Sequence, residues 1–127
     1  MTTIFFIGRL IFGFYWLRNG YRHFSGFQGT VAYASSKGVP AAKLAIIVTG
    51  LLLLAGGLSM VLGLWPAVGL VCLLVFLIPV TFKMHDYWNV ADPNMKMAQS
   101  INFWKNIGLI GAVAMMFAIS MPWPFSI

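Results

Sequence analysis

The chain has 127 residues, of which 61% are hydrophobic and 8% are charged. A soluble domain carries about 25% charged residues, so this composition argues against a water-soluble enzyme and indicates a protein that lies in a lipid bilayer. The net charge of +6 comes from eight Lys or Arg against two Asp. Because these few charges lie mostly between apolar segments, they indicate membrane orientation and contact with anionic lipid headgroups rather than nucleic-acid binding.

The first expected span covers about residues 3–20 and contains one charge in its apolar part, Arg9. At about 1.5 Å per residue, that apolar part is too short for a full crossing. We therefore expect Trp16 and Tyr21 to lie in the membrane interface, or the helix to tilt less than its neighbours. Glycines break the regularity after this span, and residues 30–37 are expected to form a short interfacial helix.

Two further spans are expected in the segment that follows. From Leu44 to Phe82 no side chain is charged. This stretch is too long for one globular core helix and fits two spans of about 20 residues each. They are expected at about residues 42–64 and 66–83, with Pro66 at the first position of the second helix, where a proline needs no amide partner.

Small residues and a proline add detail to these two spans. Gly50 and Gly57 are seven residues apart and share one helix face, which predicts a close-contact seam. Pro79 is expected to kink its helix or to mark an early end. Cys72 is the one cysteine. A single thiol excludes an intrachain disulfide, and Cys72 is expected to be a small buried residue.

The fourth expected span covers about residues 100–121, and Pro122 and Pro124 are expected to end it. Before it, residues 84–99 hold the main cluster of polar groups and are expected to form the largest connection. The sequence therefore predicts an all-α, four-helix transmembrane bundle, with residues 1–127 as a single integral membrane domain.

Basic and aromatic residues predict how the bundle lies in the membrane. The basic side chains gather in the first and third connections, at Arg18, Arg22, Lys37, Lys43, Lys83, Lys96 and Lys105. The positive-inside rule places the loops 18–43 and 83–105 in the cytoplasm and both termini outside a cell's inner membrane. The five tryptophans are expected in interfacial belts, with Trp16, Trp88 and Trp104 at one face and Trp65 and Trp123 at the other.

Arg9 is the first candidate site residue. A charge at membrane depth is costly and is a functional-site hypothesis by default. The alternative is that its long side chain reaches the headgroups or pairs in a purely structural way. No acidic residue lies in any expected span. The partners of Arg9 would then be backbone carbonyls, an anionic lipid, a quinone oxygen or another subunit.

His85 is the second candidate, within the connection after the third span. A histidine in the interface can protonate near neutral pH. It could donate to a quinone carbonyl, with Trp88 or Tyr87 stacking on the ring. The alternative is an interfacial belt with a solvated ion pair, such as Asp86 with Lys83.

Metal and haem sites are not expected from this sequence. His23 and His85 are the two histidines, and no His-x-x-x-His or Cys-x-x-Cys-His motif exists. We expect no intrinsic cofactor and no metal, with bound lipids and, in one hypothesis, a quinone.

Several short motifs, spread along nearly the whole chain, together resemble those of a known family. They are Gly8-Arg9, Gly20, Gly38-Val39-Pro40, Ala55-Gly56-Gly57-Leu58, His85-Asp86-Tyr87-Trp88 and Asn102-Phe103-Trp104-Lys105-Asn106-Ile107. With these motifs in this order, the chain resembles the DoxX family of small four-span membrane proteins. Family members often carry a glutamate shortly before the Gly-Gly pair, where it could pair with the first-span arginine. Here Leu51–Leu54 fill that region.

The resemblance implies a link to membrane redox complexes, because the family is named from a subunit of thiosulfate:quinone oxidoreductase. Our first hypothesis is a non-catalytic accessory or assembly subunit of a larger membrane complex, with the bilayer and other membrane subunits as partners. The alternative is a quinone-reactive oxidoreductase subunit of the thiosulfate:quinone oxidoreductase type. In that alternative Arg9, His85 and Lys105 are the catalytic candidates, and Arg9, His85 and Trp88 contact the quinone or a lipid headgroup.

Overall fold

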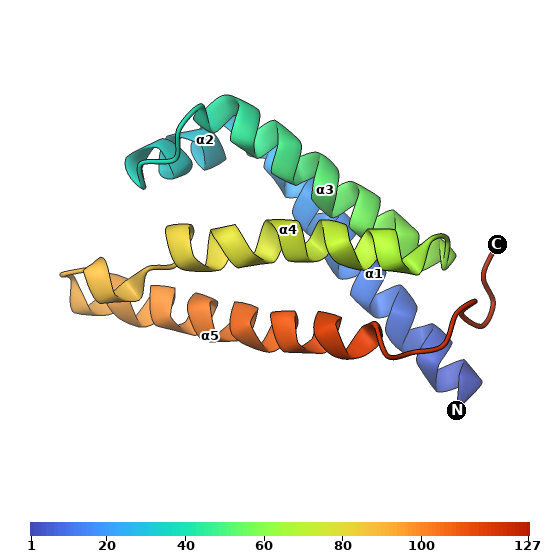
Figure 1. Cartoon of the computed structure of the whole chain (residues 1–127). Coiled ribbons are helices and arrows are strands. Elements are labelled where there is room, and N and C mark those ends of the chain that lie inside the picture. The colour runs from blue at the N-terminus through green and yellow to red at the C-terminus, as the bar shows by residue number, and fades with distance from the viewer.

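The computed structural model covers the whole chain, Met1–Ile127, and is all-α (Figure 1). In chain order the helices are α1 (Thr2–Ser25), α2 (Phe27–Ser36), α3 (Ala42–Leu62), α4 (Pro66–Met84), the short 3₁₀ helix η1 (Tyr87–Asn89) and α5 (Pro93–Met116). Two stretches are long and apolar enough to cross a membrane, namely α3 and the stretch from α4 through η1. The all-α prediction is confirmed, and the four expected spans fall on α1, α3, α4 and α5.

The four long helices pack one on the next, in the order α1, α3, α4 and α5 (Figure 1). Because α5 packs chiefly against α4 and η1, much of its surface is not covered by the rest of the chain. Both termini lie at one end of the molecule, while α2 and the connection between α4 and α5 lie at the other (Figure 1). We call these the terminal end and the basic end.

Glycines bring α1 and α3 into close contact. A Cβ atom added to Gly57 would lie 2.9 Å from the carbonyl oxygen of Gly13 and 2.8 Å from the backbone nitrogen of Leu17. A Cβ atom added to Gly50 would lie 2.7 Å from the ring of Phe24. Real Cβ atoms do not approach so closely. Glycine is required at position 57, where the neighbours are backbone atoms, whereas at position 50 the ring of Phe24 would have to move aside. The predicted seam at Gly50 and Gly57 is therefore confirmed.

The main core forms where the four long helices meet the C-terminal segment. Its buried members are Trp16, Leu53, Met60, Leu70, Leu73, Leu77, Val113 and Trp123. Trp16 and Trp123 do not face lipid headgroups as expected, because each is only 2% exposed. The ring of Trp16 packs edge to face against Phe76, and that of Trp123 against Phe5. These rings fill the space between helices. Cys72 is half-buried rather than buried.

Two expectations on helix ends need correction, and a third is confirmed. Helix α1 continues through the basic stretch to Ser25, and at 24 residues it is about 36 Å long, which is enough for a full crossing. Helix α4 runs past Pro79 to Met84, so the end expected near residue 83 is confirmed and an early end at Pro79 is excluded. The interfacial helix expected at 30–37 begins earlier, as α2.

The segment expected as the largest connection, 84–99, is partly helical. Helix α5 begins at Pro93, because the Asp92 carboxylate accepts a hydrogen bond from the backbone N–H of Met95 at 2.9 Å and caps the helix. The helix also ends earlier than expected, at Met116. The last residues then turn back toward α1.

Candidate functional site

Arg9 fixes the C-terminal segment against α1. The residue is 5% exposed. Its Nη1 donates to the carbonyl of Pro124 at 2.8 Å and its Nη2 to the carbonyl of Phe125 at 3.0 Å. A longer bond from Nη2 reaches the carbonyl of Val61 on α3, at 3.4 Å. Of the partners that the sequence left open, backbone carbonyls are the ones present.

An apolar cavity of about 440 Å³ lies beside Arg9 at the terminal end. Helices α1, α3 and α5 and the C-terminal segment form its wall. The residues are Phe5, Gly8, Phe12, Met60, Ala112, Met115, Met116, Ile119 and Trp123. The Nε atom of Arg9 is buried and has no hydrogen-bond partner. Since buried donors are normally paired, this N–H is an exception among the buried polar groups of the protein.

His85, directly after α4, begins a chain of three hydrogen bonds at the basic end. Its Nδ1 lies 2.7 Å from Oε1 of Gln99 on α5. The Nε2 of Gln99 donates to the hydroxyl of Tyr33 on α2 at 2.7 Å, and this hydroxyl donates to the carbonyl of Met84 at 2.9 Å. Because a carbonyl can only accept, the direction of every bond is fixed, and Nδ1 of His85 carries a hydrogen. Its Nε2 has no partner in the protein.

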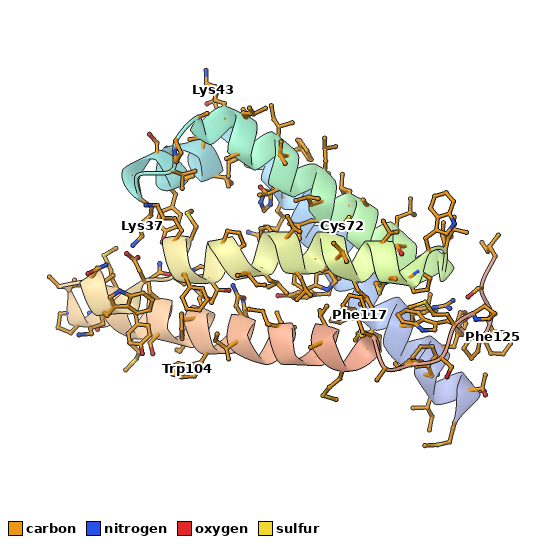
Figure 2. The ribbon with its side chains drawn as sticks, viewed as in Figure 1. Lys37, Lys43, Cys72, Trp104, Phe117 and Phe125 are labelled. Carbon is orange, nitrogen blue, oxygen red and sulfur yellow. The ribbon has the colours of Figure 1, made fainter.

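Asp86 pairs with Lys37 and not, as expected, with Lys83. Lys37 follows α2 and points toward the connection after α4 (Figure 2), while the Nζ of Lys83 lies beside Gly38. Asn89 also donates to Asp86, at 3.1 Å. The hydrogen bond from Lys37 lowers the pKa of Asp86.

Burial and nearby positive charges lower the pKa of His85 and favour its neutral imidazole. Burial lowers its pKa, the hydrogen bond to Gln99 opposes this, and the positive charges of Lys105 and Lys37 lower the pKa further. The ordinary histidine pKa of about 6.5 is already below neutral pH, so a lowered pKa leaves the ring uncharged at pH 7. With its hydrogen on Nδ1, the neutral ring presents Nε2 as an acceptor rather than a donor.

Trp88 belongs to an aromatic cluster at the same end. Its ring packs edge to face against Phe103 of α5 and against Tyr87. Phe103 in turn contacts Phe82 near the end of α4. Trp88 is half exposed, so one side of its ring is free to contact a lipid or another ligand.

A second cavity, of about 370 Å³, opens at the basic end between α1, α2, α3 and α4. We call it the basic-end cavity. Its polar lining residues are His23, Thr30, Tyr33, Thr49, Lys83 and His85, and the rest of the wall is mainly apolar. The volume lies in the range of small-molecule sites. No group of three or more His, Cys, Asp or Glu side chains is placed to hold a metal ion.

The comparisons with known proteins agree with the membrane character of this fold. The DoxX family model matches residues 4–86. The chain is also 31% identical over 112 residues to the inner membrane protein YphA of Escherichia coli (strain K12). The aligned region covers 85% of this chain and 76% of that protein. The chain belongs to the DoxX family. No solved structure matches it. The resemblance read from the motifs is confirmed, and so is the membrane localisation.

The predicted site residues of this DoxX protein fall into two groups. Arg9 lies at the terminal end, whereas His85, Trp88 and Lys105 lie at the basic end, where Lys105 influences the pKa of His85. Helix α4, whose 19 residues span about 28 Å, separates the two ends. One small ring therefore cannot contact Arg9 and His85 together.

Three functional groups of the DoxX protein were not identified from the sequence. Tyr33 and Gln99 complete the hydrogen-bond chain of His85. His23 had been considered for haem alone, but it lines the basic-end cavity together with His85. The partners lie in different helices, far apart along the chain, so no local motif could have joined them.

Proposed function

We propose that this DoxX protein crosses the membrane four times, at about residues 3–20, 42–64, 66–83 and 100–121. It serves as a non-catalytic accessory or assembly subunit of a larger membrane redox complex. The length of α1 supports the first crossing. The carbonyl bonds of Arg9 also support it, because they pair a charge that would otherwise be costly in lipid.

The position of Phe103 supports the fourth crossing. Phe103 packs against Phe82, near the basic end of α4. The part of α5 before Phe103, which includes Lys96, therefore extends beyond the end of α4. This supports an entry of α5 into the bilayer near Ser100, with Trp104 at headgroup level.

The outer face of α5 is the observation that carries the subunit proposal. Exposed residues recur on it at a strict four-three spacing, at Met97, Ile101, Trp104, Gly108, Gly111 and Met115. This is the seam pattern by which one helix pairs with another. Trp104 lies on the side of α5 that faces away from α4 (Figure 2).

Gly108 and Gly111 have no packing role within the chain. A Cβ atom on either would meet nothing within 4 Å, in contrast to the glycines of the α1–α3 seam. Glycine inside a helix costs about 0.5–1 kcal/mol relative to alanine. In membranes, small residues let a neighbouring helix approach closely. A helix of another subunit would account for both glycines.

The test is to express the protein with a tag at its natural level, extract it in mild detergent and measure the mass and subunit ratio of what it accompanies. We expect a larger complex of fixed composition. Gly108→Leu should release the protein from this complex. Gly29→Leu is the matched control, because a Cβ on Gly29 of α2 also meets nothing within 4 Å and Gly29 lines none of the cavities described above. A bare, stable monomer from the wild type would refute the proposal.

A second candidate function is a quinone-reactive subunit of the thiosulfate:quinone oxidoreductase type, with the ring in the cavity beside Arg9. The position of Arg9 in the wall of this mainly apolar cavity favours it, because a guanidinium can donate a hydrogen bond to a quinone carbonyl. His85, Trp88 and Lys105 would then act on a separate ligand or on headgroups.

A photoreactive quinone tests this second candidate. Labelling should map to peptides of α1 and α5 that line the cavity beside Arg9. Ala112→Phe fills that cavity and should abolish the labelling, whereas Ala114→Phe on the exposed side of α5 should not. Equal labelling of both variants would eliminate this site.

A further inference from the structure

The basic-end cavity adjoins a second space of opposite character. This polar pocket, of about 410 Å³, is lined by Asn19, Arg22, His23, Ser25, Gly26 and Thr30, and none of these is hydrophobic. His23 and Thr30 line both spaces, so the apolar cavity and the polar pocket meet there. Together they suit an amphipathic molecule.

The charges around the two spaces are positive and unpaired. Arg22 lines the polar pocket and Lys83 lines the basic-end cavity. The chain has two acidic residues. Asp86 is paired with Lys37, and Asp92 caps α5. Both acidic side chains are therefore engaged elsewhere, and Arg22 and Lys83 have no acidic partner. A bound anion would provide one.

The two histidines offer acceptors for hydroxyl groups. Nδ1 of His23 lies 3.0 Å from the carbonyl of Asn19, so it carries the hydrogen of the neutral ring. Nε2 of His23 is then an acceptor with no partner in the protein, as it is in His85. Both rings line the basic-end cavity. A ligand that places hydroxyl donors here would satisfy both nitrogens.

We propose that these two spaces bind one anionic glycerophospholipid whose headgroup carries free hydroxyls. The phosphate lies against Arg22, with Lys83 adding positive charge, and the hydroxyls donate to the two Nε2 atoms. One acyl chain enters the apolar cavity along α3 and α4. The basic end is also where the positive-inside rule places anionic headgroups. The inference does not depend on a partner subunit, because one chain forms the whole site.

The test uses the delipidated full-length protein in detergent and follows lipid retention by native mass spectrometry. We expect phosphatidylglycerol to be retained more than phosphatidic acid, which lacks headgroup hydroxyls, and more than phosphatidylcholine, which has no net charge. Free glycerol 3-phosphate should not bind, because it has no chain for the cavity. Equal retention of phosphatidylcholine would overturn the proposal. So would tight binding of glycerol 3-phosphate, or displacement of phosphatidylglycerol by a short-chain quinone.

Matched variants locate the site. Arg22→Gln should weaken binding of phosphatidylglycerol about tenfold, the effect of one charge-assisted hydrogen bond. Arg18→Gln is the control, because Arg18 is exposed one turn earlier on α1 and lines neither space. Equal binding by these two variants would overturn the assignment. Neither changes a buried group, so both are expected to fold.

Two further variants separate the chain from the headgroup. Val80→Trp fills the apolar cavity and should abolish retention, whereas Val71→Trp on the exposed side of α4 should not. His23→Phe keeps a ring but removes one acceptor, so it should reduce the preference for phosphatidylglycerol over phosphatidic acid. An unchanged preference would refute the role given to the histidines.

Discussion

Gln99 of α5 donates a hydrogen bond to the hydroxyl of Tyr33 on α2, at 2.7 Å and across 66 residues of sequence. This bond connects the start of α5 to α2. Tyr33 also bonds to Met84, and Gln99 also bonds to His85. Three segments at the basic end are thus held by one continuous chain of polar contacts.

Removing the hydroxyl of Tyr33 should destabilise the basic end. Tyr33→Phe leaves the amide of Gln99 and the carbonyl of Met84 without their partner, which costs about 1–2 kcal/mol. The loss is measured by reversible unfolding in mixed micelles. Tyr21→Phe is the control, because Tyr21 is exposed on α1, and it should leave stability unchanged. Equal stability of the two variants would mean that water replaces the chain of bonds.

Arg9→Met should free the C-terminal segment. The variant loses the bonds to Pro124 and Phe125, and we expect a loss of about 2–4 kcal/mol because bonds from a charged donor are among the stronger ones. Carboxypeptidase digestion followed by mass analysis should show trimming past Trp123, which the wild type resists. Arg18→Met, a change on the exposed side of the same helix, should leave the segment resistant. A resistant Arg9→Met variant would show that the bonds of Arg9 do not hold the segment.

Gly57→Ala should separate α1 from α3. The new methyl group meets the backbone of Gly13 and Leu17, and backbone atoms cannot move aside as a flexible side chain can. Overpacking of this kind costs about 1–3 kcal/mol, measured as a lower midpoint of unfolding. The same substitution at Gly108 should raise the stability of the isolated chain by up to about 1 kcal/mol, because it improves helix propensity without a clash. A neutral Gly57→Ala variant would contradict the close seam.

The ion pair of Asp86 with Lys37 should make stability depend on acid pH. The folded pKa of Asp86 lies below its ordinary value of 3.8, so the pair stabilises the fold above that pH. The contribution disappears as the pH falls through the folded pKa. Wild type should exceed Asp86→Asn by about 1 kcal/mol near neutral pH, and the difference should vanish in strong acid. A difference that stays constant with pH would exclude this carboxylate as its source.

The termini should lie outside the cytoplasm. They share one end of the molecule, and the basic connections lie at the other. By the positive-inside rule, the end with the basic connections faces the cytoplasm and the end with the termini faces away from it. A reporter that is active only outside the cytoplasm should be active when fused after Ile127, and a cytoplasmic reporter should be active when inserted after Lys37. The reverse pattern would invert the topology.

The sequence alone determined the solvent of this protein and the number of its long helices. Between Leu44 and Phe82 the absence of charge indicates a non-aqueous environment, and the length of the stretch and the position of Pro66 divide it correctly into two helices. The spacing of Gly50 and Gly57 also predicted the seam, because two residues seven apart share a helix face whatever surrounds them. These are properties of a helix by itself.

The partners of the polar residues were decided by tertiary structure. Arg9 could have met lipid, quinone or carbonyls, and its partners became known only when the C-terminal segment turned back onto α1. In the sequence, Trp16 and Trp123 look like the other tryptophans that flank apolar segments. In the structure their rings fill the core between the helices. Likewise His23 and His85 line one cavity, although they are distant in sequence. Local periodicity fixes which way a side chain points from its own helix, but only the packing of the helices fixes what it meets.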